Sequence, residues 1–311
     1  MKFVVTGALG HIGSQLIRKL AEYYPGSEIL LIDSMMTQRY CSLFNLPSGA
    51  KYRFIDSDLM KLDLPNLLKG ADVVVQLAAI TDAANSFQNK EAVEQNNFNT
   101  TAKLGEACIV TGSKLIHLSS TSVYGTADES VDEFCSDEQL KPQSPYAETK
   151  LKEEKFLVEL AGRGLKHVTF RFGTICGVSP GMRFHTAVNK FCWQSVMGIP
   201  ITVWKTALHQ KRPYLDLTDA TRAVQFVIDR DLFSGLVYNV VTSNHTVQEI
   251  LDMIKLRIAR FDVEFVDAAI MNQLSYDVMN TRFKEAGFTF SGSIDHAVES
   301  TIQLLKGAAT A

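Results

Sequence analysis

The sequence lacks the features that mark membrane-spanning and disulfide-stabilised proteins. No apolar run is long enough to cross a bilayer, and Met1–Val5 leads directly into a glycine turn where a secretory leader would continue as a longer apolar stretch. The five cysteines are odd in number and scattered, without a CxxC pair, which argues against a disulfide framework or a zinc site. We therefore expect a cytoplasmic protein with reduced thiols, no bound metal and no membrane partner.

A strong net charge is also lacking. The 31 Lys and Arg residues nearly balance the 34 Asp and Glu residues, and the formal charge of −3 gives the chain no general attraction for nucleic acid. We find no internal repeat and no low-complexity segment, and 46% of the 311 residues are hydrophobic. That content is enough to bury one large core or two smaller ones.

Short apolar runs alternate with helix-like segments through the first half of the chain. Continuous apolar strands separated by helices are typical of a parallel sheet that is covered on both faces. Repeated strand–helix units of this kind predict a doubly wound α/β domain of the Rossmann type. We expect strands at Lys2–Thr6, Glu28–Asp33, Lys51–Asp56, Asp72–Leu77, Lys114–Ser119 and His167–Phe172, and helices at His11–Tyr24, Glu91–Val110 and Tyr146–Ala161.

The rhythm changes after Arg171, and a smaller α+β lobe is expected at the C-terminal end. The segment 173–181 is rich in Gly, Ser and Pro and is predicted to be a loop. Tyr214–Leu217 and Leu236–Val241 are expected to return to the main sheet, with a helix near 220–228 between them. The lobe should contain helices at Thr186–Met197, Val247–Arg260 and Ile294–Leu305 and a strand at Ile201–Trp204. We therefore assign residues 1–172 and 212–241 to the sheet domain and residues 173–211 and 242–311 to the lobe.

A glycine turn joins the first strand to the first helix, in the order Gly7, Gly10, His11, Ile12 and Gly13. Glycines let the backbone approach a pyrophosphate, and the free N–H groups and dipole of the helix attract it. Asp33 ends the second strand, at the spacing expected of a carboxylate that hydrogen-bonds an adenosine ribose and repels a 2′-phosphate. These features predict the binding of NAD rather than NADP.

Two further segments fit the same cofactor. Asp58 and Leu59 follow the third strand, where an aspartate can meet the adenine amino group. The fourth strand ends in small residues that would let the cofactor lie close to the backbone, at Leu77, Ala78 and Ala79.

Residue types suited to proton transfer follow the fifth strand. Tyr146 and Lys150 are four residues apart and share one face of a helix. The lysine ammonium favours the phenolate, and a base that works near neutrality needs a downward pKa shift of roughly three units from about 10. Ser120 and Ser122 stand at the carboxyl end of the strand, the edge of a parallel sheet at which ligands bind. A hydroxyl there can hydrogen-bond the reacting oxygen of a substrate.

Taken together, these residues resemble the extended short-chain dehydrogenase/reductases, the NAD-dependent epimerase/dehydratase family, and especially nucleotide-sugar epimerases such as UDP-glucose 4-epimerase. Further positions shared with the family are Asn96, Ser119-Ser120-x-x-Val123-Tyr124-Gly125 and Arg212-x-Tyr214-x-Asp216. The resemblance implies tightly held NAD, with Asn96, Tyr146 and Lys150 among its contacts, and a C-terminal lobe that binds the substrate. It also implies catalytic roles for Ser120, for Tyr146 as the base and for Lys150 as its partner.

The resemblance implies a nucleotide-sugar substrate as well, although several positions depart from the family pattern. Arg212 matches the family's phosphate-binding arginine, and the other candidate substrate contacts are Thr81, Ser122, Thr174, Arg183 and Asn189. The departures are Gln76 where a His is frequent, Ser57 where a Gly is usual, Thr174 where many epimerases have an Asn, Cys176 where a Tyr is common, and no Arg near Asp267–Asp277. These changes leave the nucleotide and the sugar open.

Three functions remain to be distinguished. Thr121 and Ser122 precede Val123-Tyr124-Gly125, where the family's dehydratases and decarboxylating enzymes carry an acid, and a hydroxyl is a poor base. We therefore expect epimerisation, by transient oxidation of the sugar's 4′-hydroxyl to a keto-sugar and re-reduction on the opposite face. The alternative is an oxidoreductase, a keto-sugar reductase or dehydrogenase with exchangeable NADH. A cofactor-sensing scaffold is the third reading, and the intact Ser120, Tyr146 and Lys150 argue against it.

The two helices that flank the catalytic strand end carry more apolar positions than one packed face requires. These positions are Phe98, Ala102, Gly105, Cys108 and Ile109 in the first helix and Leu151, Phe156, Leu157 and Leu160 in the second. The family resemblance implies that such helices pair with their twins across a two-fold axis, and two-fold dimers are the commonest oligomers. We expect a homodimer, against the alternative that all these side chains lie in the monomer core.

Overall fold

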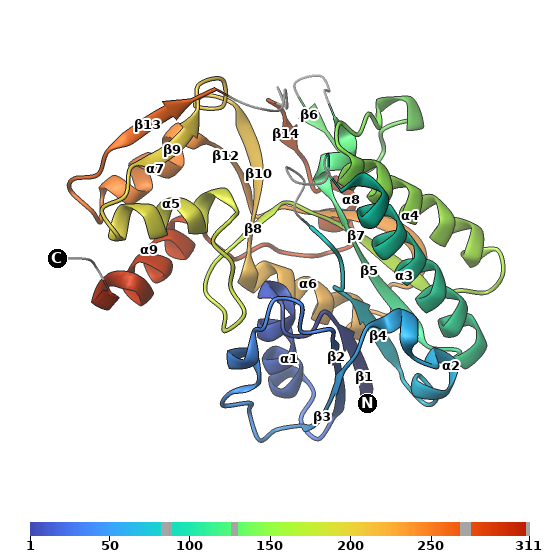
Figure 1. Ribbon diagram of the computed structural model, residues 1–311. Helices are drawn as coiled ribbons and strands as arrows, with labels where there is room; N and C mark the ends of the chain where they lie inside the picture. Colours follow the sequence, from blue (N-terminus) through green and yellow to red (C-terminus); the bar gives the residue numbers. More distant parts are fainter. Residues whose placement is uncertain (82–86, 88, 126–129, 268–274, 309–311) are drawn as a thin grey trace.

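A parallel sheet lies at the centre of the computed structural model, which describes residues 1–81, 87, 89–125, 130–267 and 275–308 (Figure 1). Its order is β11-β7-β5-β4-β1-β2-β3, so the direction in which strands are added reverses beside β1. Ligands of open α/β sheets bind at the carboxyl ends of the strands next to such a reversal. The strands are β1 (Lys2–Thr6), β2 (Glu28–Asp33), β3 (Lys51–Asp56), β4 (Val73–Gln76), β5 (Lys114–Ser120), β7 (His167–Phe172) and β11 (Ser234–Val240).

Helices cover both faces of this sheet (Figure 1). Because successive side chains of a strand point to opposite faces, Phe3 and Val5 pack into one core layer while Val4 packs into the other. The first layer is closed by α1 (His11–Tyr23), α6 (Leu217–Asp229) and α8 (Thr281–Glu285), and the second by α2 (Leu64–Leu67), α3 (Lys90–Thr111) and α4 (Pro145–Ala161). The predicted fold class, a doubly wound α/β domain, is confirmed.

A second lobe lies on the far side of the molecule from α3 and α4 (Figure 1). It has its own apolar core, to which Val188, Ile250 and Val298 contribute from three different helices. Its elements are the helices α5 (Ala187–Val196), α7 (Val247–Lys255) and α9 (Ile294–Leu305), the three-stranded sheet of β8 (Thr174–Cys176), β10 (Lys211–Asp216) and β12 (Ser243–Thr246), and the pair β9 (Ile201–Trp204) and β13 (Val263–Val266). A short pair, β6 (Ser130–Val131) and β14 (Asp277–Val278), lies near the end of β5 (Figure 1).

Two predictions for this region were wrong in detail. Tyr214–Leu217 does not return to the main sheet, because β10 pairs with β8 and β12. Tyr214 packs into the core of the second lobe and its neighbour Leu215 into the core of the sheet domain, so β10 runs along the junction of the two cores. The predicted loop at 173–181 contains β8, and the helix that begins at Val247 ends at Lys255 rather than Arg260.

The remaining return to the sheet is confirmed, since β11 pairs with β7 in parallel. Helix α6 also packs in the sheet-domain core, through Ala220, Ala223 and Val227. The domain boundaries at 172, 212 and 241 stay a prediction. Among the described residues, no helix is both long and apolar enough to cross a membrane.

Candidate active site

The glycine turn leaves the N-terminus of α1 without a capping side chain. Gly7 has a φ of +62°, and a β-carbon on it would lie 2.7 Å from the backbone nitrogen of Ala78. A β-carbon on Gly13 would collide with the carbonyl oxygen of Gly7. Gly10 precedes the helix without a side-chain cap, so the first N–H groups of α1 are not used by a capping side chain. The chain here has the shape and polarity that a pyrophosphate needs.

Asp33 holds the glycine turn from the end of β2. Its Oδ2 accepts a hydrogen bond from the backbone of Leu9 at 3.0 Å, and its Oδ1 accepts one from Met35 at 3.0 Å. The half-buried carboxylate therefore stands beside the turn, where a ribose would lie. Arg39, which the sequence analysis missed, reaches the same place, with Nη1 3.8 Å from where a β-carbon on Gly10 would lie. Burial lowers the pKa of Arg39, and the charge of Asp33 opposes that effect.

The small residues after β4 are fixed by an asparagine that the sequence analysis passed over. Asn97 is buried, and its amide accepts from Ile80 N at 2.8 Å and donates to Ile80 O at 2.9 Å. The predicted cofactor residue Asn96 donates to Asn97 Oδ1 at 2.9 Å and keeps part of its surface exposed. The half-buried segment 77–80 lies against Gly7. The only sign of this role in the sequence is that Asn97 directly follows the predicted cofactor residue Asn96.

Asp58 and Leu59 have clear local roles. Asp58 caps a short 3-10 turn by accepting from Met60 N at 2.9 Å, and the side chain of Leu59 belongs to the core layer under α3. Their contacts with the adenine stay a prediction.

The two adjacent serines at the end of β5 face different surroundings. Ser119 is buried and donates a hydrogen bond to Glu154, whereas Ser120 is partly exposed. Ser120 Oγ accepts from Ser122 Oγ at 2.9 Å and from Ser122 N at 3.2 Å. It also hydrogen-bonds the phenol of Tyr146, which brings Ser120, Ser122 and Tyr146 together. Of the two serines, Ser120 is the one open to a substrate.

Tyr146 and Lys150 lie on the first two turns of α4. The helix begins with Ser144 as the N-cap, whose hydroxyl accepts from Ala147 N at 3.2 Å, and Pro145 as its first residue. Burial raises the pKa of Tyr146, and the charges of Lys150 and Arg183 together with the Ser120 hydrogen bond act in the opposite direction. The phenol of the protein alone is therefore a weaker acid than free tyrosine, and a further positive group at the site would favour its ionisation.

The segment 177–183 crosses from the second lobe onto the glycine turn. His11 Nε2 donates to Gly177 O at 2.9 Å, and Ser179 Oγ donates to His11 O at 2.8 Å. Gly181 N donates to Ser14 Oγ at 2.9 Å. The His11 ring is buried in this contact, and burial lowers its pKa to about 4. The predicted cofactor residue His11 thus joins the two lobes through its side chain.

Arg183 lies at the end of this segment, within electrostatic range of both halves of the site. Its charge lowers the pKa of Tyr146 and contributes to the lowered pKa of His11. Asn189 is fully buried, and its amide accepts from Gly177 N at 3.3 Å and donates to Arg183 O at 3.0 Å. Asn189 therefore supports the segment that carries Arg183.

The other predicted substrate residues occupy three places. Arg212 is half-buried on β10, where Nη2 donates to Gln210 at 3.0 Å and burial lowers its pKa. Thr174 lies on β8 opposite Tyr214 and is half-buried. The hydroxyl oxygen of Thr81 is buried and has no hydrogen-bond partner in the described part of the chain. Most of the region near Asp267–Asp277 that lacks an arginine, residues 268–274, lies outside the described residues.

The sequence also matches a known protein family over most of its length. The model of the NAD dependent epimerase/dehydratase family matches residues 3–240. The chain belongs to that family. Membership confirms the resemblance drawn from the sequence, and the family's dependence on NAD agrees with the predicted cofactor.

Curated relatives include more than one activity. The chain is 30% identical to the uncharacterized UDP-glucose epimerase YtcB of Bacillus subtilis over 77% of this chain and 76% of that protein. It is 31% identical to an Arabidopsis thaliana trifunctional enzyme, RHM2, named for UDP-glucose 4,6-dehydratase, UDP-4-keto-6-deoxy-D-glucose 3,5-epimerase and UDP-4-keto-L-rhamnose-reductase activities. That match covers 92% of this chain but 44% of the relative, so the chain spans less than half of the trifunctional protein.

Solved structures agree over nearly the whole chain. MoeE5 in complex with UDP-glucuronic acid and NAD is 27% identical with a TM-score of 0.87, covering 99% of this chain and 100% of that one. UDP-glucuronic acid 4-epimerase from Bacillus cereus, also in complex with UDP-glucuronic acid and NAD, is 25% identical with a TM-score of 0.85 over 99% and 100% of the two chains. The chain thus shares the architecture of these two proteins over nearly its whole length.

Proposed function

We propose that this chain is an NAD-dependent nucleotide-sugar epimerase that inverts the carbon bearing the 4′-hydroxyl. The observation that carries the proposal is the grouping of Ser120, Tyr146 and Lys150 at the carboxyl end of β5, where the two positions before Val123 carry hydroxyl side chains instead of carboxylates. Relatives named as UDP-sugar epimerases, among them YtcB and the Bacillus cereus enzyme, support it.

The protein's part in the reaction is to move one proton and to hold one oxygen. The glycine turn at Gly7, Gly10 and Gly13 would hold NAD, which would accept the hydride and later return it. Tyr146 as phenolate takes the proton of the sugar hydroxyl onto Oη, and Ser120 orients that oxygen by a hydrogen bond. After the keto-sugar turns in the site, its other face would be presented for return of the hydride to carbon, and Tyr146 gives its proton back to the oxygen. Lys150 keeps positive charge beside the phenolate through both steps.

Dehydration needs more than this set of groups. Removal of water from the sugar requires an additional base for a carbon-bound proton and an acid for the departing hydroxyl. Thr121 is buried and donates to Phe172 O at 3.3 Å, and Ser122 donates to Ser120. Within the described residues, neither position before Val123 offers a carboxyl group, which supports epimerisation over the dehydratase activity named in several relatives.

An oxidoreductase acting on a keto-sugar is the second candidate. It is favoured by the reductase activity in the name of the trifunctional relative. The two functions differ in how the cofactor is handled, because an epimerase must retain reduced cofactor through its cycle and a reductase must exchange it. Conversion of the nucleotide sugar without added NADH supports the epimerase. Consumption of one NADH for each sugar converted supports the reductase.

Cationic side chains on the lobe side of the site are available to bind the diphosphate of a nucleotide sugar. We propose that Arg212 and Arg183 contact the substrate phosphates, since both are half-buried and Arg183 already acts on Tyr146. Ser122 and Thr174 would meet the sugar. We also propose a cytoplasmic location, because all five cysteines are free.

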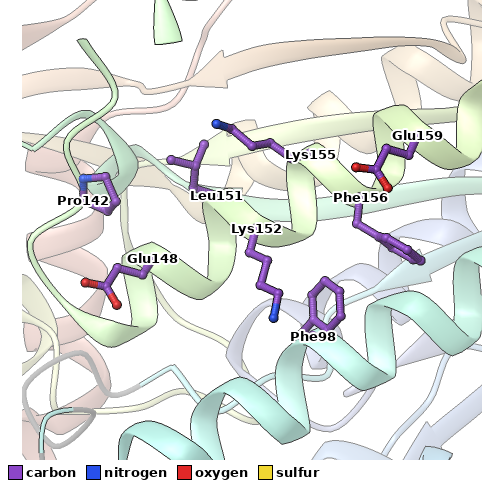
Figure 2. Close-up of a pocket in the computed structure, with 8 residues that line it drawn as sticks. All are labelled: Phe98, Pro142, Glu148, Leu151, Lys152, Lys155, Phe156 and Glu159. Carbon is purple, nitrogen blue, oxygen red and sulfur yellow. The ribbon is translucent and has the colours of Figure 1, made fainter. Parts of the chain in front are cut away.

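We further propose a homodimer built on α3 and α4. Part of the predicted apolar set lies in the monomer core, including Cys108, Leu157 and Leu160. Phe98, Leu151 and Phe156 of that set line a groove between the two helices, which Figure 2 shows together with Pro142, Glu148, Lys152, Lys155 and Glu159. Its two acidic and two basic side chains suit a contact between identical surfaces, in which each charge meets its opposite on the twin.

The proposed activity is tested with a panel of UDP-, GDP-, CDP- and dTDP-sugars. Each is incubated with the NAD-loaded protein, and proton NMR follows the appearance of the C4 epimer. We expect one nucleotide series to be converted, and the proposal fails if every sugar is recovered unchanged or emerges as a 4-keto-6-deoxy product.

A further inference from the structure

A row of buried polar side chains runs behind the Tyr146–Lys150 pair. Lys150 Nζ donates to Glu153 Oε2 at 2.9 Å, one turn further along α4. His117 Nε2, from β5, lies 3.3 Å from the same carboxylate oxygen. The relative exposure of Lys150 is 3%, and that of Glu153 and His117 is 0%. A carboxylate with no exposed surface is therefore the first neighbour of the catalytic lysine.

Gln76 explains how this arrangement is held. Its amide donates to Thr101 Oγ1 at 2.7 Å, which leaves its carbonyl oxygen to accept from His117 Nδ1 at 2.8 Å. Thr101 in turn donates to Asn97 O at 3.0 Å, so the row ends on α3. Gln76 is the residue that departs from the family's histidine, and here it sets the position of the His117 ring against Glu153.

Burying a charged carboxylate costs free energy unless a partner compensates it. An apolar side chain would fill the space of Glu153 without the free-energy cost of burying a charge, so packing alone does not explain a glutamate at this position. Lys150 is the group it compensates. The same negative charge also lies close enough to Tyr146 to oppose formation of the phenolate.

We propose that Glu153 is a positioning residue of the active site, whose carboxylate holds the Lys150 ammonium and sets how strongly that charge acts on Tyr146. This inference rests on the proposed use of Tyr146 as the base. Among the described residues no hydrogen bond joins Glu153 to the phenol, and Glu153 acts on Tyr146 through its own charge and through Lys150.

The electrostatic directions agree with this role. Burial works against the charged form of Lys150, but Glu153, Tyr146 and Glu154 outweigh it, and the pKa of Lys150 is raised. Burial also raises the pKa of Glu153, with Lys150 opposing. Burial lowers the pKa of His117, so the ring beside Glu153 is neutral.

The charged and titratable groups that face this cluster come from four elements. They are Tyr146, Lys150 and Glu154 on α4, His117 on β5, His167 and Arg171 on β7, and Arg183 from the segment over the glycine turn. Arg171 forms an ion pair with Glu154, and Lys150 forms its ion pair with Glu153.

Glu153→Gln tests the proposal, because it removes the charge and keeps the shape. Glu153 raises the pKa of both Tyr146 and Lys150, so its loss should move the acid limb and the alkaline limb of the turnover–pH profile to lower pH, each by about one unit. Glu106→Gln, an exposed carboxylate on α3, is the matched control and should leave both limbs in place. A purely structural role would lower turnover or stability without moving the limbs.

A second readout separates this inference from the proposed function. Tyrosine labelled with carbon-13 at Cζ reports the ionisation of Tyr146 by NMR in the NAD-loaded protein without any substrate, with Tyr146→Phe assigning the signal. We expect its titration midpoint to fall in Glu153→Gln. If the midpoint falls but no sugar is epimerised, the proposed function fails and the role of Glu153 stands.

Glu153→Asp keeps the experiment decisive if the glutamine variant does not fold. It withdraws the carboxylate from Lys150 by one methylene, and the shift should have the same sign and a smaller size. An unchanged Tyr146 midpoint in whichever of the two variants folds overturns the proposal.

Discussion

The buried Arg171 donates hydrogen bonds to both carboxylate oxygens of Glu154. Its Nε lies 3.1 Å from Oε1 and 3.2 Å from Oε2, and its Nη2 lies 2.7 Å from Oε2. Ser119, the neighbour of Ser120, donates to the same carboxylate. Arg171 thereby fixes the helix that carries Tyr146 and Lys150 to β7, and Ser119 fixes it to the strand that carries Ser120.

The first prediction concerns this ion pair. Glu154→Ala leaves the Arg171 guanidinium buried without its partner, and such losses cost about 3–5 kcal/mol of unfolding free energy. Urea denaturation measures it. Glu94→Gln breaks the exposed pair with Lys152 and serves as the control, which should unfold close to the wild type. Equal midpoints for both variants would contradict the structural role given to Glu154.

The second prediction concerns cofactor choice. Asp33→Asn removes the charge that repels a 2′-phosphate but keeps an oxygen for the Leu9 N–H group, while Arg39 remains nearby. NAD should bind about tenfold more weakly, a change of about 1.4 kcal/mol, and the gap to NADP should narrow. Titration calorimetry with both cofactors measures this. Equal affinity of the wild type for NAD and NADP would argue against the role of Asp33.

The third prediction concerns the base. Tyr146→Phe keeps the ring and removes the proton acceptor, so turnover should fall by a factor of about 10²–10⁴ while NAD stays bound. Because the phenol must lose its proton, wild-type turnover should rise with pH through the Tyr146 pKa, which burial raises. Steady-state rates and the absorbance of bound cofactor follow the two effects. Turnover within a few-fold of the wild type would rule out the mechanism.

The fourth prediction concerns stability in acid. Burial lowers the pKa of His11 and of His167 to about 4 in the folded protein, below the usual value of 6.5. The unfolded chain therefore binds protons first, and stability that is full above pH 6.5 is lost as pH falls toward 4.

His167→Gln isolates one of these two contributions. It should flatten the dependence of the unfolding free energy on pH by up to about 1.4 kcal/mol per pH unit in that window. Guanidinium denaturation at a series of pH values measures the slope. A slope identical to that of the wild type would mean that the pKa of His167 is the same in the folded and the unfolded chain, which would contradict the effect of burial.

The fifth prediction concerns assembly. Lys155→Glu makes the groove of Figure 2 predominantly acidic, so two copies should repel, and sedimentation should shift from dimer to monomer at micromolar concentration. Lys155 is 56% exposed, so folding should be preserved. Lys284→Glu on α8, which covers the opposite sheet face, is the charge-matched control. A wild type that sediments as an active monomer defeats the proposed dimer.

Local pattern was enough to predict most of the sheet domain. β1 and β2 have the residues predicted from their apolar runs, because a strand covered on both faces leaves an uninterrupted apolar signal. The edge strand β3 and the buried strand β7 also have the predicted bounds, although polar residues interrupt both runs. The spacing of Tyr146 and Lys150 likewise follows from helix geometry alone. Tyr214–Leu217 was misplaced because its apolar residues are compatible with either sheet, and its partners β8 and β12 are distant in sequence.

The residues that were missed act through contacts that no sequence window contains. Asn97 holds the backbone of Ile80, and Arg39 reaches the glycine turn from beyond β2. Glu153 resembles any charged residue on a helix until the fold places His117 beside it. Sequence spacing therefore located the groups that do chemistry, while the groups that position them required the structure.

The fate of deuterium placed on C4 of the substrate tests the central claim most directly. Nucleotide sugar labelled at C4 is incubated with the NAD-loaded protein in the presence of unlabelled free NADH, and NMR and mass spectrometry locate the label. Epimerisation by hydride removal and return predicts deuterium on C4 of the inverted sugar, with none in the free cofactor. Label on C6 would mean dehydration, and label lost to the free cofactor pool would mean an exchanging oxidoreductase, and either result would contradict the account.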